Sequence, residues 1–305
     1  PAPLAELKRV APDVEFIPVR TRDDAAKAVE DADAVLGFCS PEIVKTGKNL
    51  RWIHVNYAGV DKDMSPELIG SKIVLTNGQR ISGPNVADQA FALLLALTRG
   101  VREVVPEEVK AESWRKPQSN LEELHGKTML VIGLGGIGTQ VSRRGHAFGM
   151  RVMAVDPKDM ERPSFVFSLD KPAKLMELLP QADVIVVACP LTPETRGSIG
   201  AEQFKAMKKS VYFINIARGG IVQTPALVEA VEAKQIAGVG LDVTDPEPLP
   251  NGHPLWKKSN VVISPHIGGQ SSGLRDRQWR LLRENVRRFV AGERLLCVVD
   301  KEKGF

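Results

Sequence analysis

The chain has 305 residues and a formal net charge of +4, with 43% hydrophobic and 26% charged residues. This length is typical of two domains, and the hydrophobic fraction is that of a globular protein with buried cores. No run of about 18 apolar residues occurs, so no transmembrane helix is expected. The basic residues are interspersed with acidic ones, which argues against nucleic-acid binding.

Three cysteines, Cys39, Cys189 and Cys297, lie far apart in the sequence and form no CxxC pattern. Such cysteines predict neither a disulfide framework nor a metal site, and they fit a reducing compartment such as the cytoplasm. The chain begins at Pro1 with a helix-like segment, whereas a βαβ domain normally opens with a strand. We therefore expect residues upstream of this sequence.

The first part of the chain alternates between short apolar runs and more polar, helix-like runs. Strands are expected at 14–17, 34–37, 52–55 and 73–76, and helices at 4–10, 23–30 and 41–45. This alternation predicts βαβ units and a parallel sheet. Residues 86–99 are then apolar nearly all round, which predicts a helix buried between domains or between the subunits of a homodimer.

A second alternating series follows residues 101–125, which predict a helix and then an extended connection. Strands are expected at 128–132, 151–155, 165–167, 184–188, 211–216, 238–243 and 261–264. Helices are expected between them, at 137–148, 171–180, 201–207 and 224–234. An amphipathic helix at 274–291 leads to a last strand at 295–299, which could return to the first domain and make that domain discontinuous.

A glycine-rich turn follows the strand expected at 128–132. It contains Gly133, Gly135 and Gly138 in the GxGxxG pattern, where the glycines permit a tight turn, the approach of a pyrophosphate and close packing of helix on strand. Asp156 ends the next strand, near the ~20-residue spacing of a ribose-binding acid. Its carboxylate would repel a 2′-phosphate, so we predict NAD rather than NADP, although Lys158 would favour a phosphate.

Further motifs follow in order along the chain. They are VNYAGVDK (55–62), VADQAFALLLALTRG (86–100), VIGLGGIG (131–138), CPLTPETRG (189–197), NIARGGIV (215–222), GLDVTDPEPLP (240–250), HPLW (253–256), SPHIGG (264–269), ENVRRFVAGE (284–293) and VVDKEKGF (298–305). Over nearly the whole chain they resemble the D-isomer-specific 2-hydroxyacid dehydrogenase family. The resemblance implies an α/β protein in which an NAD-binding Rossmann domain, 85–272, is inserted into a smaller flavodoxin-like parallel-sheet domain, 1–84 and 273–305, with the active site in the cleft between them.

Three candidate catalytic residues each follow a separate expected strand. Arg218 lies where ligands bind in doubly wound sheets, and its guanidinium suits a substrate carboxylate and the adjacent carbonyl oxygen. His266 is the candidate proton donor, because an imidazole titrates near neutral pH. Three acids, Asp242, Asp245 and Glu247, compete as its partner. The resemblance selects Glu247 as that partner and implies that Asp242 contacts the nicotinamide carboxamide.

The remaining site residues lie in loops. The turn of Ala58, Gly59 and Val60 exposes backbone N–H groups that can bind the substrate carboxylate. The alternative is an ordinary βα turn, in which the glycine serves only to adopt a positive φ. The pair Gly268-Gly269 would let the backbone lie close to the nicotinamide. The resemblance implies further cofactor contacts at Gly136, Ile137, Pro157, Cys189, Pro190, Thr195, Ile216 and Ala217.

The predicted function is reversible hydride transfer between NAD(H) and a small 2-oxo or (R)-2-hydroxy acid, without a metal. Gln223 and Thr244 replace an aspartate and an aromatic residue that are frequent in the family, which puts the fit of the substrate in doubt rather than the activity. An alternative is an NAD(H)-sensing, corepressor-like interaction protein on the same fold, which the intact trio disfavours. Phosphite oxidation also stays open, whereas formate enzymes have glutamine in place of Glu247.

Overall fold

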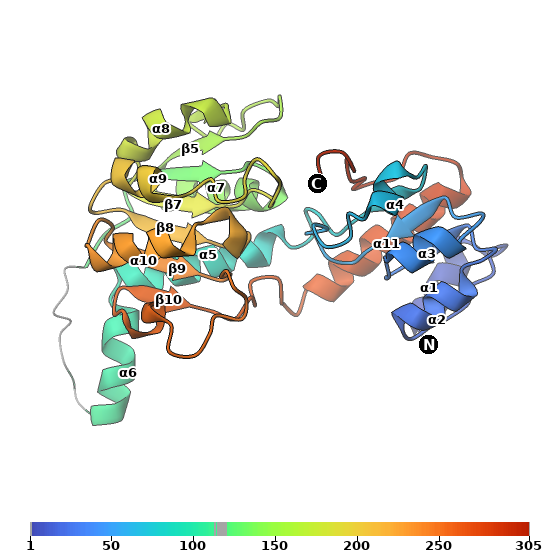
Figure 1. The fold of residues 1–305 in the computed structure, drawn as a ribbon, viewed down its shortest axis with the longest axis horizontal. Coiled ribbons are helices and arrows are strands. Elements are labelled where there is room, and N and C mark those ends of the chain that lie inside the picture. Colours follow the sequence, from blue (N-terminus) through green and yellow to red (C-terminus); the bar gives the residue numbers. More distant parts are fainter. Residues whose placement is uncertain (1, 113, 115–120, 305) are drawn as a thin grey trace. The chain divides into compact units, whose positions relative to one another are not determined.

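The computed structural model describes residues 2–112, 114 and 121–304, and the chain divides into two compact units (Figure 1). Unit 1 comprises Pro1–Ser82 and Ser271–Phe305, and unit 2 comprises Gly83–Gln270. Each unit contains its own parallel sheet, of three and seven strands respectively. The α/β fold class predicted from the sequence is therefore confirmed.

The sheet of unit 2 has the strand order β10-β9-β8-β7-β4-β5-β6, with all neighbours parallel. Its strands are β4 (Thr128–Ile132), β5 (Arg151–Val155), β6 (Ser168–Asp170), β7 (Val184–Val187), β8 (Tyr212–Asn215), β9 (Gly238–Leu241) and β10 (Val261–Ile263). The order reverses between β4 and β7. In open parallel sheets such a reversal opens a crevice at the carboxyl ends of the strands, where ligands bind.

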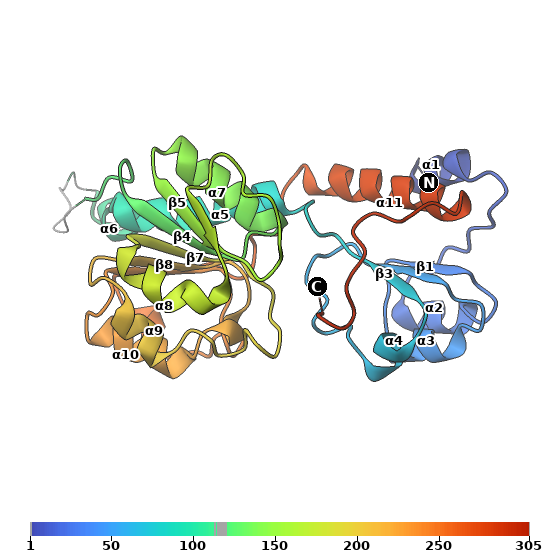
Figure 2. The same cartoon turned by 90° about the horizontal axis from the view of Figure 1, so that it is seen from above.

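Helices cover both faces of this sheet (Figure 2). On one face lie α8 (Leu175–Leu178), α9 (Ala201–Ala206) and α10 (Thr224–Glu232), and on the other α5 (Gly83–Thr98) and α7 (Gly136–Ala147). Leu130 and Ile132 of β4 point to the first face, while Met129 and Val131 point to the second. Because both faces are covered, the central strands are mostly apolar rather than alternating with polar residues.

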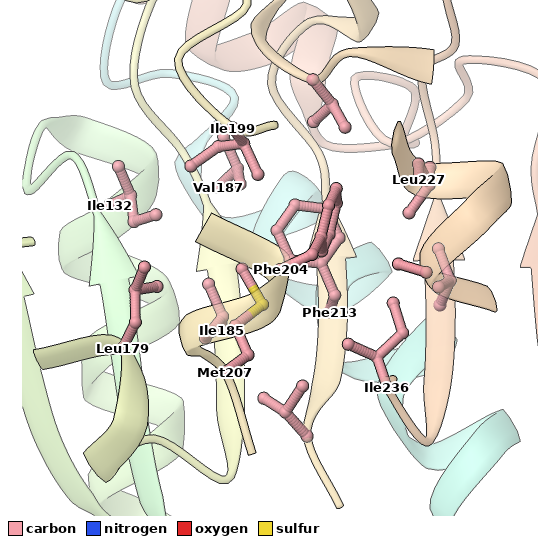
Figure 3. Packing of buried hydrophobic residues seen from close by; sticks show 14 of the residues in the cluster. Ile132, Leu179, Ile185, Val187, Ile199, Phe204, Met207, Phe213, Leu227 and Ile236 are labelled. Atoms are coloured by element: carbon pink, nitrogen blue, oxygen red, sulfur yellow. The ribbon is translucent and has the colours of Figure 1, made fainter. Parts of the chain in front are cut away.

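The packing on the first face is centred on Phe204, which meets Phe213 edge-on with ring centroids 5.4 Å apart (Figure 3). Unit 2 also contains short 3-10 turns at Pro172–Lys174, Leu179–Gln181, Gly219–Ile221 and Pro254–Lys257. Helix α6 (Val101–Ala111) follows α5. None of the helices in the described part of the chain is both long and apolar enough to cross a membrane.

Helix α5 buries its apolar residues inside unit 2. Phe91 stacks on Phe148 with ring centroids 5.1 Å apart, and Leu93 and Leu94 join the cluster formed with α7 and the sheet. Packing within one unit therefore accounts for the apolar character from which burial between domains or subunits was predicted. The homodimer stays a prediction.

Unit 1 is built on β1 (Ala34–Leu36), β2 (Trp52–His54) and β3 (Val74–Thr76). One face packs against α2 (Arg22–Ala28), α3 (Pro41–Thr46) and α4 (Pro66–Gly70), and the other against α1 (Ala2–Val10) and α11 (Leu274–Val290). Helix α4 was not predicted. Segments from both ends of the chain thus complete one core.

Three predicted strands were wrong or incomplete. Residues 14–17 form no strand, and Ile17 is 61% exposed. Residues 165–167 form a turn before β6, where Phe167 lies under the guanidinium of Arg151 at 3.7 Å. The last segment contributes an isolated antiparallel bridge from Val298 to Thr76 at the edge of the small sheet. Residues 113 and 115–120, inside the predicted extended connection, lie outside the described residues.

Candidate active site

The glycine-rich turn between β4 and α7 needs glycine for space as well as for conformation. Gly133 has φ +95°, and a Cβ added there would lie 2.6 Å from the backbone nitrogen of Cys189, which follows β7. A Cβ at Gly138 would overlap the carbonyl oxygen of Gly133. The turns after β4 and β7 therefore meet at the point where the strand order reverses, and only glycine permits this approach.

The first turn of α7 offers a site for an anion. Gly135 caps this 12-residue helix without a side-chain hydrogen bond, and a Cβ there would meet nothing within 4 Å. The N–H groups of Gly136, Ile137 and Gly138 have no acceptor among the described residues. N–H groups without a partner, next to open space at Gly135 and at the positive end of the helix dipole, fit the pyrophosphate of a dinucleotide.

Asp156 follows β5 and is 7% exposed. Its Oδ2 accepts a hydrogen bond from the backbone N–H of Leu134 at 2.8 Å, and its Oδ1 accepts one from Lys158 N–H at 2.9 Å. Each carboxylate oxygen has a second lone pair, so ribose hydroxyls can still donate to Asp156. The residues of the glycine turn and Asp156 together fit an adenosine dinucleotide.

The turn after β8 holds Arg218. The buried side chain of Asn215 accepts from Ala217 N–H and donates to the carbonyl oxygen of Arg218, both at 3.0 Å. Gly219 lies so close to the next loop that a Cβ there would overlap Thr244 O. Arg218 itself donates from Nη1 to Ala217 O at 2.8 Å. The loop carrying Arg218 is therefore packed directly on the segment that leads to Glu247.

The side chains of Glu247 and His266 form a close hydrogen-bonded pair in unit 2. Oε1 of Glu247 lies 2.6 Å from Nδ1 of His266, and the two side chains are 43% and 44% exposed. They follow β9 and β10, which are neighbours in the sheet, next to β8 with Arg218. The Nε2 atom of His266 has no hydrogen-bond partner within the described residues. With Nδ1 turned to the carboxylate, Nε2 can carry a proton to or from a substrate.

Of the three competing acids, Glu247 is the one whose carboxylate meets the imidazole. Asp242 is 3% exposed, and its carboxylate accepts hydrogen bonds from Ser264 Oγ, Ile267 N–H and Gly268 N–H at 2.6, 3.1 and 2.9 Å. These contacts hold the turn around His266. The sequence reasoning did not find this role for Asp242.

Two residues of α5 contact the turn at residues 264–268, and the sequence did not lead us to identify them as site residues. Asn85 donates from Nδ2 to Gly268 O at 2.7 Å, and Gln89 donates from Nε2 to Ser264 Oγ at 2.8 Å. A signal for them was present in the sequence: two amide side chains stand four residues apart on a largely apolar helix. At that spacing they lie on one face, where unpartnered amides would be costly to bury.

The predicted substrate loop belongs to unit 1. The N–H groups of Ala58, Gly59 and Val60 have no acceptor among the described residues. Their loop is braced from behind, because Asn77 Nδ2 donates to Ala58 O at 2.6 Å and Gln278 Nε2 donates to Asn56 O at 3.1 Å. With the carbonyl groups engaged, the free N–H groups resemble the backbone concavities that bind carboxylates.

Gln223 and Thr244, which depart from the family pattern, each form a side-chain hydrogen bond to a backbone carbonyl oxygen of a loop. Gln223 Nε2 donates to Gly197 O at 2.7 Å, and Thr244 Oγ1 donates to Pro246 O at 2.9 Å. Thr195 Oγ1 likewise donates to Pro190 O at 2.7 Å, within a motif expected to contact the cofactor. These three side chains fix the shape of the loops at the carboxyl end of the sheet.

Comparison with known proteins decides the family. Residues 91–268, more than half of the chain, match the family model described as D-isomer specific 2-hydroxyacid dehydrogenase, NAD binding domain. The chain belongs to the D-isomer specific 2-hydroxyacid dehydrogenase family. The resemblance seen in the sequence is thereby confirmed, and a nicotinamide dinucleotide is the cofactor of this dehydrogenase domain.

Similar proteins cover nearly the whole chain. A glyoxylate reductase of Pyrococcus horikoshii is 37% identical over 92% of this chain and 86% of its own length. The D-3-phosphoglycerate dehydrogenase of Methanocaldococcus jannaschii is 30% identical over 94% of this chain and 55% of its own length. Among solved structures, a glyoxylate reductase from Paecilomyes thermophila is 27% identical, with a TM-score of 0.83 over 98% of this chain and 95% of that one. The TT0316 protein of Thermus thermophilus is 33% identical, with a TM-score of 0.77 over 97% and 96%.

Proposed function

We propose that this protein is an NAD-dependent dehydrogenase that interconverts a small 2-oxo acid and the corresponding (R)-2-hydroxy acid. The observation that carries the proposal is the 2.6 Å contact between Nδ1 of His266 and Oε1 of Glu247. Glu247 follows β9 and His266 follows β10, and β9 is the neighbour of β8, which precedes Arg218. An imidazole held by a carboxylate at the ligand-binding edge of a dinucleotide-binding sheet is suited to acid–base work on a substrate oxygen.

Each residue of the proposed site has a separate role in the reaction. When bound, the nicotinamide ring supplies or accepts the hydride. As negative charge develops on the carbonyl oxygen of the 2-oxo acid, the proton on Nε2 of His266 is transferred to that oxygen. Glu247 holds the ring through Nδ1 and stabilises its protonated form. Arg218 orients the carboxylate and carbonyl of the substrate, and the N–H groups of residues 58–60 bind the carboxylate.

Glyoxylate is the first substrate to test, because several relatives that are 33–37% identical are named glyoxylate reductase. Hydroxypyruvate, pyruvate and bulkier 2-oxo acids offer the same carboxylate and carbonyl group. A panel of these acids, together with phosphite as a hydride donor to NAD, would define the substrate class.

We propose NAD in preference to NADP on the position of Asp156. Its carboxylate is nearly buried and lies at the end of β5, where a 2′-phosphate would lie against its negative charge. Lys171 Nζ is committed to Pro157 O at 2.9 Å and Asp159 Oδ1 at 2.6 Å, which reduces its availability for a phosphate. Steady-state assays with NADH and NADPH test this, and a strong preference for NADPH would contradict it.

Assembly and location are proposals as well. We propose a homodimer that uses residues 86–99, and a mass measured by light scattering that equals one chain would overturn it. Free Cys39, Cys189 and Cys297 support a reducing compartment such as the cytoplasm, because thiols persist there.

The deciding experiment is the substitution His266→Ala in the full chain. We expect turnover of a 2-oxo acid to fall by ~100-fold or more, within the usual contribution of a general acid, while NADH binding measured by fluorescence is retained. His146→Ala, which removes an exposed histidine of the same unit, is the matched control and should keep turnover. Unchanged turnover in His266→Ala would refute the proposed function.

A further inference from the structure

The backbone of His266 adopts a conformation that its residue type disfavours. Its φ of +53° lies in the left-handed region, where a side chain with a Cβ is strained. The N–H of His266 donates to the carbonyl oxygens of Asp242 and Ser264, at 2.9 and 3.0 Å. Surrounding structure must hold such a residue in place, and here most of that structure is Asp242.

The segment 264–268 is bound to Asp242 at four points. Besides His266 N–H on its carbonyl oxygen, its carboxylate accepts from Ile267 N–H, Gly268 N–H and the hydroxyl of Ser264. The carboxylate is nearly buried, so each of these hydrogen bonds is made away from competing water and is costly to remove. The position of His266 therefore depends on how well Asp242 is held.

A serine and a glutamine complete this arrangement, and the glutamine comes from α5. Ser264 Oγ lies 2.6 Å from Asp242 Oδ1 and 3.5 Å from Leu241 O, so its single proton points to the carboxylate. The lone pairs that remain on the hydroxyl accept a hydrogen bond from Gln89 Nε2 at 2.8 Å. The directions are thus consistent: Gln89 donates to Ser264, which donates to Asp242. Hydrogen bonds in such a series strengthen one another.

We propose that Gln89 and Ser264 are positioning residues for His266, acting through the buried carboxylate of Asp242. The inference rests on the proposed function of His266 as the proton carrier. Neither residue needs to touch the substrate or the cofactor. They connect the turn that carries His266 to a long buried helix, and a rigid element fixes a reactive group more accurately than a loop does.

This role predicts a specific kinetic signature. Substrate binding is assigned to Arg218 and to residues 58–60, so loosening the turn at residue 266 should leave KM for the 2-oxo acid nearly unchanged. Proton transfer requires Nε2 of His266 at hydrogen-bond distance from the substrate oxygen, so kcat should fall. A role in stability alone would change the unfolding temperature without this separation of kcat from KM.

The test compares Ser264→Ala, Ser264→Thr, Gln89→Met and the double variant Ser264→Ala/Gln89→Met. We expect kcat to fall by ~10- to 100-fold in Ser264→Ala, the range that a displacement of a reacting group by about 1 Å produces. Ser264→Thr keeps the hydroxyl and should restore kcat to within about threefold of the wild type. Gln89→Met should lower kcat less than Ser264→Ala does. The double variant should equal Ser264→Ala, because residues that act in one series are not additive.

Thr98→Val is the control, since Thr98 is buried on the same helix and its hydroxyl donates to Leu94 O within that helix. This variant should lower stability without lowering kcat. If the wild type reduces no 2-oxo acid, the proposed function is refuted, and this result is distinct from any difference between the variants. If the wild type is active, then wild-type kcat in folded Ser264→Ala and Gln89→Met overturns the positioning role. A Ser264→Thr variant as slow as Ser264→Ala, or a double variant with additive losses, also overturns it. Should Ser264→Ala not fold, Gln89→Met and Ser264→Thr decide by the same criteria.

Discussion

His54 gives the sharpest prediction about stability, because it is a titratable group inside the core of unit 1. It lies on β2, is 1% exposed, and its Nδ1 is 2.8 Å from Thr76 Oγ1. The indole N–H of Trp52 donates to the same oxygen at 2.8 Å. Burial lowers the pKa of His54 from 6.5 to about 4, and its effect exceeds that of a side-chain hydrogen bond with Asn56, which acts in the opposite direction. His54 is therefore neutral in the folded protein at neutral pH.

The sign of the effect follows from the lower pKa in the folded state. Between about pH 6.5 and pH 4 the unfolded chain binds a proton at His54 and the folded protein does not, so acid favours unfolding. The stability associated with neutral His54 is fully present above pH 6.5 and is lost as the pH falls toward 4. Since a tenfold change in proton affinity corresponds to ~1.4 kcal/mol, the difference between 6.5 and 4 amounts to about 3 kcal/mol at pH 4.

The assay is urea unfolding of the wild type and of His54→Gln between pH 4 and 8, followed by tryptophan fluorescence. Trp52 lies in the same core, with its ring centroid 6.1 Å from that of His54, and reports on unit 1. The free energy of unfolding of the wild type should fall by about 3 kcal/mol more than that of His54→Gln across this range. The comparison of slopes cancels whatever the substitution does at neutral pH. Parallel pH curves, or an imidazole NMR signal of His54 that titrates near pH 6.5, would refute the reasoning.

Three further predictions concern single side chains. Ser142 Oγ is buried without a partner within the described residues, so Ser142→Ala should raise the free energy of unfolding by about 1 kcal/mol in urea titrations; a loss of stability would contradict this. Gly138→Ala should weaken NADH binding by ~10-fold or more in fluorescence titrations, because its Cβ would overlap Gly133 O; wild-type affinity would show that the turn can move. Asn77→Ala should raise KM for the 2-oxo acid by ~10-fold with kcat within about threefold, since Asn77 braces the loop at Ala58 through a 2.6 Å hydrogen bond; unchanged KM would remove that loop from substrate binding.

Much of unit 2 was predictable because its signals are local. Its strands are apolar on both faces, and glycine, proline or polar residues mark the ends of most of them, so nearly all strand positions were found within a few residues. The glycines of the turn after β4 also carry their reason in the sequence, since a tight turn followed by a helix requires them. The same holds for the positions of Arg218, Glu247 and His266 after three different strands.

The errors occurred where pairing, rather than composition, decides the structure. Residues 14–17 are as apolar as a strand, yet they form no strand, and Val14 and Phe16 pack against the cluster of α1 and α11 instead. Residues 165–167 failed for a related reason. Phe167 N–H does bond to Val152 O, but the ladder with β5 begins only at Ser168. A short apolar run does not specify its own register.

Local sequence patterns were enough to establish an α/β protein with a dinucleotide turn, and to place an arginine, an acid and a histidine after separate strands. Residue patterns alone left Asp242, Asp245 and Glu247 open as the partner of the histidine, and the resemblance selected Glu247. Tertiary structure brings that carboxylate to the imidazole through the path of the loop after β9. It also decided that the buried acid Asp242 holds the turn of His266 with help from Ser264 and Gln89, since hydrogen bonds across 22 and 175 residues leave no local pattern. Both differences arise because sequence periodicity reports burial, whereas the partner of a polar group depends on the packing of segments far apart in the chain.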